Sequence, residues 1–127
     1  MNMKYISTKK APKAVGPYSQ AIVSNGFIYC SGQIGIDPKT NDLVKGFEEQ
    51  TQQALENLSE VLEAGNSSLE KVVKTTVYLV DIKDYGTMNE IYGQYFSEHK
   101  PARAAFAVAH LPKDALIEIE VVAEVDK

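Results

Sequence analysis

The sequence predicts an α+β fold in which two helices pack on one face of a single β-sheet. Segments with the pattern of strands and segments with the helical spacing of apolar residues follow the order β-β-β-α-β-α-β-β along the 127 residues. Hydrophobic residues make up 44% and charged residues 24%, which is typical of a globular protein that buries a core without disulfides or a metal. No linker, repeat or low-complexity segment divides the chain, so we expect residues 1–127 to form one domain.

The N-terminal part of the chain predicts three strands. A polar segment with two prolines, residues 9–17, separates the first strand from the second. The second and third strands flank Asn25-Gly26, which is a strong hairpin signal because both residues tolerate a positive φ. A polar loop follows over residues 37–42. These three strands are predicted over residues 5–8, 18–24 and 27–36.

Residues 46–64 show the clearest helical pattern. Apolar and small residues recur there at i, i+3, i+4 and i+7, polar residues cover the other side, and Gly65 follows as a helix stop. A second helix is predicted after Asp84, a favourable N-cap residue, and it ends before Pro101. Large side chains form a stripe along this helix, namely Tyr85, Met88, Tyr92 and Tyr95.

Three further strands are predicted over residues 71–80, 103–109 and 116–125, the last two joined by a short turn that contains proline. The segment 71–80 is rich in β-branched residues and is apolar on both faces. Since two helices cover only one face of such a sheet, the other face must be buried by another partner, and the simplest partner is a second copy of the chain. We therefore expect a homo-oligomer whose sheets face each other.

Charge and composition exclude several classes of protein. The net charge is −4 and the basic residues are scattered, which argues against a nucleic-acid-binding surface. Cys30 is the only cysteine, so no internal disulfide forms, and a reducing compartment is favoured. No apolar run has the length of a membrane span and no signal-peptide pattern is present, so we expect a cytoplasmic protein that does not bind membranes.

A cation lies in an apolar segment near the C-terminus. With a period of two, Arg103 shares its strand face with Ala105, Ala107 and Ala109, and three alanines beside a guanidinium leave a hollow. A fixed cation at the end of a small apolar hollow is suited to a small carboxylate, which arginine binds through two parallel hydrogen bonds. The alternative is an arginine at the start of a strand, with its stem on apolar surface and its head group in solvent.

Glu118 and Glu120 alternate along the last predicted strand. Both can form the ordinary polar face of a half-exposed strand, and we expect one of them to do so. A hairpin that turns near residues 110–115 places Glu118 opposite residues 105–107, roughly 7–13 Å from the Cα atom of Arg103 at about 3.3 Å per residue. A glutamate in that position is suited to deprotonating a water while the arginine holds the substrate.

Further candidates for the site lie outside this hairpin. Tyr18 follows a Gly-Pro pair that holds it stiffly, which suits a pocket wall with a hydroxyl donor, although it can equally be a packed residue at a strand entry. Ser31 and Gly32 interrupt an apolar strand, and glycine inside a strand indicates a bulge or the close approach of another group. Asn89, judged alone, is typical of a surface or capping residue.

Metal and cofactor sites are not predicted. His99 and His110 are isolated from other metal-ligating residues, and there is no glycine-rich phosphate loop or nucleophile elbow. Cys30 lies in the middle of a predicted strand, where an inert buried thiol is expected.

Several segments together resemble the RidA family, also called YjgF, and the resemblance covers essentially the whole chain. Each motif alone is weakly specific, but five in the family's order and spacing are strongly specific. They are Gly16-Pro17-Tyr18-Ser19-Gln20-Ala21, Ser31-Gly32-Gln33-Ile34, Asn89-Glu90-Ile91-Tyr92, Pro101-Ala102-Arg103, and Leu111-Pro112-Lys113-Asp114 through Ile117-Glu118-Ile119-Glu120.

The resemblance implies a chorismate-mutase-like fold, a mixed and mostly antiparallel sheet with two helices on one face, assembled as a homotrimer with clefts between subunits. It also implies a deaminase that hydrolyses reactive enamines and imines, released by pyridoxal-phosphate-dependent dehydratases, to 2-oxo acids and ammonia. The substrates are 2-aminoacrylate/2-iminopropanoate and 2-aminocrotonate/2-iminobutanoate, and no cofactor or metal is needed. By the same resemblance, Arg103 binds the substrate carboxylate, Glu118 activates water, and the pocket positions are Tyr18, Ser31, Gly32, Asn89 and Ala105.

One position departs from the family pattern. Ala105 stands where many deaminating members have cysteine, so a role that depends on that thiol is lost while the backbone groups stay available.

The sequence leaves two other functions open. One is a non-catalytic regulatory trimer that binds a metabolite in the same cleft, and the other, disfavoured by the acidic charge, is a translation inhibitor or ribonuclease.

Overall fold

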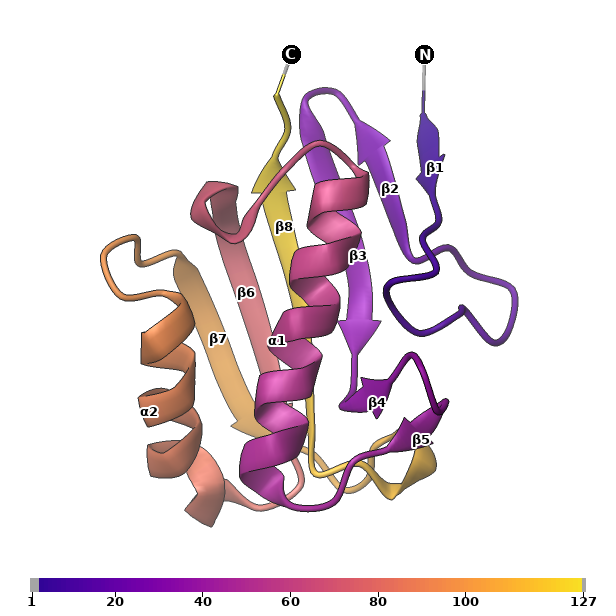
Figure 1. The fold of residues 1–127 in the computed structure, drawn as a ribbon. Coiled ribbons are helices and arrows are strands. Elements are labelled where there is room, and N and C mark those ends of the chain that lie inside the picture. Colours follow the sequence, from indigo (N-terminus) through magenta and orange to yellow (C-terminus); the bar gives the residue numbers. More distant parts are fainter. Residues whose placement is uncertain (1–2, 127) are drawn as a thin grey trace.

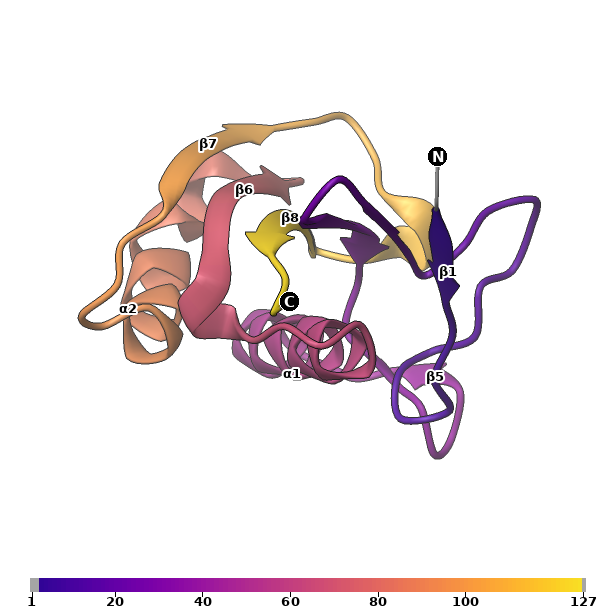
Figure 2. The same ribbon diagram turned by 90° about the horizontal axis from the view of Figure 1, so that it is seen from above.

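A computed structural model describes residues 3–126, and in it both helices lie on the same side of a six-stranded sheet (Figures 1 and 2). The sheet has the order β1-β2-β3-β8-β6-β7, and all neighbours are antiparallel except β6 and β7. The predicted α+β fold with a mixed, mostly antiparallel sheet is therefore confirmed. The strands are β1 (Lys4–Ile6), β2 (Ala21–Ser24), β3 (Phe27–Gln33), β6 (Val72–Leu79), β7 (Ala102–Ala107) and β8 (Ile117–Glu124).

The N-terminal hairpin forms as predicted. Asn25 (φ 52°) and Gly26 (φ 84°) turn the chain between β2 and β3 in the left-handed conformation that a tight hairpin requires. The predicted third strand is interrupted after Gln33. A small second sheet of β4 (Ile36–Asp37) and β5 (Asp42–Leu43) follows, and its two strands lie at the two ends of the segment 37–42 that was predicted as a loop.

The predicted hairpin between the last two strands is wrong. Strand β7 pairs in parallel with β6, and β8 lies between β3 and β6. The helix between β6 and β7 makes a β-α-β crossover, which gives parallel strands. The segment after β7 then passes through a short 3₁₀ turn, Pro112–Asp114, before it reaches the middle of the sheet.

Helix α1 (Phe47–Ala64) packs across β8 and β3, and helix α2 (Tyr85–Tyr95) packs beside α1 (Figure 1). The core between them and the sheet consists of fully buried apolar side chains, among them Leu55, Leu58, Leu62, Val77, Leu79, Met88, Ile117 and Ile119. Helix α1 ends before Gly65 as predicted. Glycine is needed there because the side chain of Ile28 lies close to it, and not because of a positive φ. A Cβ at Gly65 would lie 2.3 Å from the Cδ1 atom of Ile28, and Asn66 (φ 65°) is the residue in the left-handed conformation.

The start of α2 differs in detail from the prediction. Asp84 occupies the N-cap position, but its side chain makes no capping hydrogen bond. The carboxylate of Asp81 instead accepts a hydrogen bond of 3.0 Å from the backbone N–H of Lys83, in a short 3₁₀ turn that leads into the helix. No helix in the described residues is long and apolar enough to cross a membrane.

The face of the sheet opposite the helices is open and partly apolar. Strand pairing places Tyr5, Tyr29 and Phe106 on this open face, and their side chains are 69%, 48% and 45% exposed. Residues directly opposite in a ladder share one face, so Tyr78, Glu118 and Phe106 also form one row across the open face.

Two buried amides of α1 hold the loops at one end of the sheet. The side-chain amide of Asn57 donates to the backbone oxygens of Ile34 (3.3 Å) and Ile36 (2.9 Å). Gln50 donates to the backbone oxygen of Val44 (3.0 Å) and accepts from the backbone N–H of Leu116 (2.8 Å). These bonds fix the turns that border the open face of β8.

We expect Asn57→Ala to lower the free energy of unfolding by about 1–3 kcal/mol, because buried carbonyl oxygens lose their donor. Urea unfolding at fixed protein concentration measures the change. Gln52→Ala, an exposed position on the same helix, serves as the control and should have little effect. Equal stability of Asn57→Ala and the control would contradict this role of Asn57.

Candidate functional site

Four of the candidate residues line one cavity of about 510 Å³ beside the open face of the sheet. Its wall includes Tyr18, Ser31, Gly32 and Glu118, which come from the N-terminal loop, β3 and β8. A volume of this size is typical of a small-molecule site. Residues from the end of β3 to β4 and from the Pro112–Asp114 turn also line it, namely Gln33, Ile34, Ile36, Pro112 and Lys113, together with residues 12–15 of the N-terminal loop.

The carboxylate of Glu118 lies directly over Gly32. The pairing of β3 with β8 shifts between Cys30 and Gln33, so Ser31 and Gly32 form an irregularity in the strand, as the sequence predicted. A Cβ atom at Gly32 would lie 2.1 Å from Oε2 and 2.8 Å from Cδ of Glu118. Only glycine therefore leaves room for the carboxylate in its observed position.

Ser31 connects the bulge to the N-terminal loop. Its hydroxyl donates to the backbone oxygen of Ser19 (2.6 Å), and its backbone N–H donates to the backbone oxygen of Gln20 (2.9 Å). Because both bonds go to the residues that follow Tyr18, they fix the base of the loop that carries this tyrosine. The Tyr18 hydroxyl accepts a hydrogen bond of 3.3 Å from the backbone N–H of Val15, and the residue as a whole is 54% exposed.

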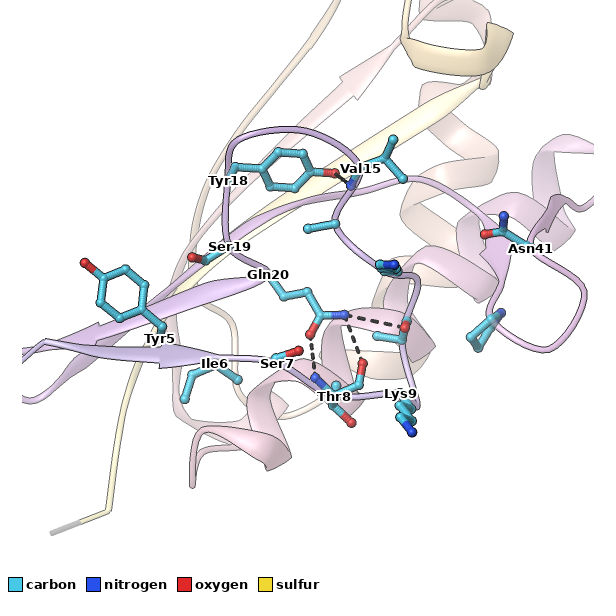
Figure 3. A pocket seen from close by; sticks show the side chains of 14 residues that line it. Tyr5, Ile6, Ser7, Thr8, Lys9, Val15, Tyr18, Ser19, Gln20 and Asn41 are labelled. Carbon is cyan, nitrogen blue, oxygen red and sulfur yellow. Dashed lines mark hydrogen bonds between the residues drawn. The ribbon is translucent and has the colours of Figure 1, made fainter.

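The buried side chain of Gln20 also holds this loop in place through hydrogen bonds (Figure 3). This buried amide accepts from the backbone N–H of Thr8 (2.6 Å) and donates to the backbone oxygens of Thr8 (3.1 Å) and Pro12 (2.8 Å). A second hollow of about 750 Å³, drawn in Figure 3, lies along the loop between Tyr5, Tyr18 and Asn41. Gln20 therefore gives the loop a fixed shape between the two cavities.

Burial and a neighbouring charge both raise the pKa of Glu118. Burial raises the pKa of its carboxyl above the usual glutamate value, and the negative charge of Glu120 raises the pKa further. Glu120 accepts a hydrogen bond from the hydroxyl of Tyr78, and this bond is the main reason that the pKa of Tyr78 rises to about 12. Glu118 is therefore the carboxylate that binds a proton more readily than usual.

Arg103 lies on the other face of the sheet. Thr75 is its partner on β6, and Thr75 is fully buried under the helices, so the arginine lies on the helix-covered face. One terminal nitrogen (Nη2) donates to the hydroxyl of Tyr85 at 2.9 Å, and the other (Nη1) contacts the sulfur of Met88 at 3.8 Å. Ala105, which shares this face as predicted, packs against the edge of the core.

The candidates thus form two groups. Arg103 and Ala105 lie at the edge strand β7, next to helix α2, which also carries the half-buried Asn89. Glu118 lies on β8, two strands away or about 10 Å in the plane of the sheet, and its side chain is on the opposite face. The expectation that Glu118 lies opposite residues 105–107 is wrong, because β6 separates the two strands and the residue opposite Glu118 is Tyr78.

Two residues near Glu118 were missed in the sequence. Tyr78 lies opposite Glu118, and alternation along β6 could have indicated that it faces outward. Lys113 lines the cavity. Its backbone has φ 57°, as does that of the following Asp114, and no pattern in the sequence indicates left-handed residues other than glycine at this turn.

Within residues 3–126 the structure contains neither a reactive cysteine nor a metal site. Burial raises the pKa of the Cys30 thiol to about 12, so it is not a nucleophile. Residues 3–126 contain no group of three or more His, Cys, Asp or Glu side chains placed to hold a metal ion.

Comparison with known proteins gives a consistent set of relatives. A family model described as endoribonuclease L-PSP matches residues 8–125. A RutC family protein of Pyrococcus horikoshii is 56% identical over 93% of this chain and 94% of its own, and a human 2-iminobutanoate/2-iminopropanoate deaminase is 55% identical over 94% and 88%. A crystal structure described as a putative endoribonuclease L-PSP from Entamoeba histolytica superposes with a TM-score of 0.95 at 54% identity and covers 98% of this chain and 100% of that one.

The raised pKa of Glu118 leads to a prediction about stability. Between the usual glutamate pKa and the raised one, the folded state binds more protons than the unfolded state, so stability falls as pH rises through this window. We expect Glu118→Gln to have a higher free energy of unfolding than the parent at pH 7. The difference should disappear below about pH 4, where both states of the parent are protonated.

Urea unfolding at both pH values and at one protein concentration tests this prediction. Glu124→Gln, at the exposed end of the same strand, is the matched control. A parent protein that is more stable than Glu118→Gln at pH 7 would contradict the prediction.

Proposed function

The chain belongs to the endoribonuclease L-PSP family, also known as YjgF or RidA, and we propose that it hydrolyses short 2-imino acids and their enamine tautomers to 2-oxo acids and ammonia. The substrate class is that named for the human relative, 2-iminobutanoate and 2-iminopropanoate. The observation that carries the proposal is the position of Glu118, a half-buried carboxylate with a raised pKa in the wall of a small cavity.

The complete site forms between two copies of the chain. Arg103 and Glu118 lie on opposite faces of one sheet, so one copy does not present both groups to a small substrate. The open face carries exposed aromatic side chains, which favours its burial against another copy. We propose a homotrimer in which the cleft between subunits joins Arg103, Ala105 and Asn89 of one copy to Tyr18, Ser31, Gly32 and Glu118 of the next.

In this cleft Arg103 binds the substrate carboxylate and Glu118 moves protons. The imine reacts in its nitrogen-protonated form, and Glu118 accepts a proton from a water molecule as the water oxygen bonds to the C=N carbon and the C=N electron pair moves to nitrogen. Glu118 then passes this proton to the amino nitrogen of the adduct. The C–N bond breaks as the hydroxyl of the adduct gives its proton to Glu118 and becomes the C=O group, so the products are a 2-oxo acid and ammonia, which takes up this proton as ammonium. A carboxyl whose pKa is raised toward neutral pH serves both steps better than an ordinary glutamate.

The main task of the protein in this reaction is to position the reacting groups. Imines react readily with water, so holding the carboxylate, the water and one acid–base group together supplies the acceleration. Ala105 leaves space beside Arg103 where a larger residue would narrow the cleft. Enzymes that eliminate water or ammonia from small amino acids with pyridoxal phosphate release such imines, and we propose a functional link to them.

The family description also names RNA cleavage. Binding to RNA depends on cations that contact phosphates, whereas this chain has a net charge of −4 and places Glu118 and Glu120 on the open face. These charges disfavour a polyanionic ligand such as RNA.

A mixing experiment tests the shared site. Arg103→Ala and Glu118→Gln should each be inactive in an assay in which a serine or threonine dehydratase generates the imine. Glu118→Gln should still bind pyruvate, which separates a catalyst from a protein that only binds the ligand. When the two variants are refolded together, random mixing should restore about a quarter of the parental activity, because about a quarter of the interfaces combine an intact Arg103 with an intact Glu118.

Each variant refolded alone is the control and should stay inactive. No recovery in trimers shown to be mixed would contradict a site shared between copies. An unchanged rate for Arg103→Ala would contradict the function itself.

Gly32→Ala tests the position of the carboxylate. The added Cβ displaces Glu118, and we expect kcat to fall about 100-fold, as for a misplaced catalytic group, while pyruvate binding changes little. Gly93→Ala is the matched control, because a Cβ there meets nothing within 4 Å. Full activity of Gly32→Ala would show that the observed position of Glu118 is not required.

A further inference from the structure

The guanidinium of Arg103 is enclosed by three uncharged side chains of helix α2. Tyr85 accepts its hydrogen bond at 2.9 Å, and Met88 contacts it through sulfur at 3.8 Å. The carbon at the centre of the guanidinium lies 4.8 Å from the ring centre of Tyr92 and 5.5 Å from that of Tyr85. These distances are within the range of cation–π contacts.

No carboxylate neutralises this cation within residues 3–126. The one ion pair found there joins Lys71 to Asp126, and the partners of Arg103 are a phenol, a thioether and two aromatic faces. A salt bridge would hold the arginine equally well, but a bound carboxylate would then compete with it. Uncharged partners hold the side chain and leave its whole charge for a ligand.

The contacts also fix the orientation of the guanidinium. Arginine has five N–H donors in a planar fork, and Tyr85 and Met88 each engage a different terminal nitrogen. Two contacts at separate nitrogens stop rotation of the plane, and about three donors remain for a carboxylate. Bidentate binding depends on such a fixed plane.

One wall of this enclosure is itself held rigidly. The Tyr92 ring is buried, and its hydroxyl shares a hydrogen bond of 2.8 Å with Thr75. Thr75 lies directly opposite Arg103 in the β6–β7 ladder, so the strand that carries the arginine and the helix that carries the ring are tied at the same level. Tyr85, in contrast, is 38% exposed and lies at the start of α2, where its hydroxyl forms the outer wall.

We propose that Tyr85 and Tyr92 form a neutral aromatic clamp that positions Arg103 for carboxylate binding, with the Tyr85 hydroxyl setting the orientation of the guanidinium. The inference rests on the carboxylate-binding role of Arg103 proposed above. In this scheme Tyr85 is a positioning residue that acts through Arg103. It therefore governs affinity for the carboxylate and leaves the proton transfers of Glu118 unchanged.

Tyr85→Phe is the direct test, since it keeps the ring and removes one oxygen. We expect the Kd for pyruvate and the KM for the imine to rise about 10- to 100-fold, as for one lost hydrogen bond to a charged group, with kcat within about twofold of the parent. Tyr95→Phe is the matched control. It removes a hydroxyl of the same helix that bonds to Glu56 instead, and it should change neither constant.

Tyr85→Glu gives a second test with a larger effect. A carboxylate at this position pairs with Arg103, so pyruvate binding should weaken more than in Tyr85→Phe, and the loss should be reduced when pH is lowered enough to protonate the new glutamate. Because Tyr85 is partly exposed, both variants should fold, and thermal unfolding and the oligomeric state are measured for each.

The outcomes separate the clamp from the function on which it rests. If Tyr85→Phe has the parental Kd and KM while Arg103→Ala loses binding, the clamp is wrong and the role of Arg103 stands. If Tyr85→Phe lowers kcat as much as it raises KM, the hydroxyl acts on the chemical step and the positioning role is overturned. If Arg103→Ala itself binds pyruvate normally, the proposed function fails first.

Discussion

The alternation of side chains along β8 is the constraint on which the rest of the structure depends. Ile117, Ile119 and Val121 are buried under the helices, so the residues between them, Glu118 and Glu120, must point to the other face. A shift of one residue in this strand would bury two carboxylates and expose three branched side chains. The hydrophobic core therefore determines on which face the carboxylates lie, before any other residue of the site is considered.

The same constraint separates the charges within one chain. Arg103 belongs to the helix-covered face through its pairing with Thr75, and Glu118 belongs to the open face. Because the two groups lie on opposite faces, they cannot form an ion pair within one chain. Their separation leaves the cation held by uncharged side chains and leaves the carboxylate with a raised pKa.

Local patterns were sufficient for most of the fold. The Asn25-Gly26 turn, the apolar spacing of α1 and the bulge at Gly32 are encoded by neighbouring residues, and each could be predicted. The order of strands in the sheet depends on long-range pairing. The segments 103–109 and 116–125 look like a hairpin in sequence, and only the crossover through α2 places β6 between them.

The candidate site likewise contains features that local patterns predict and features that they do not. The importance of Gly32 could be predicted, because a glycine inside a strand indicates the close approach of another group, and here that group is the carboxylate of Glu118. The uncharged surroundings of Arg103 could not, since Tyr85, Met88 and Tyr92 in the sequence have only the ordinary stripe of a packed helix. The alternation with alanines and the resemblance both predicted carboxylate binding by Arg103, while the contacts that hold its side chain could be seen only in the structure.

The burial of Cys30 protects the only thiol of the chain from chemical modification. Burial raises the pKa of this thiol to about 12, so the thiol stays protonated at neutral pH, and the sulfur is buried in the core. Imines are electrophiles, and thiolates are the side chains that trap electrophiles and peroxides most readily. A chain whose single thiol is shielded in this way, and which has alanine at position 105, resists alkylation and oxidation at cysteine.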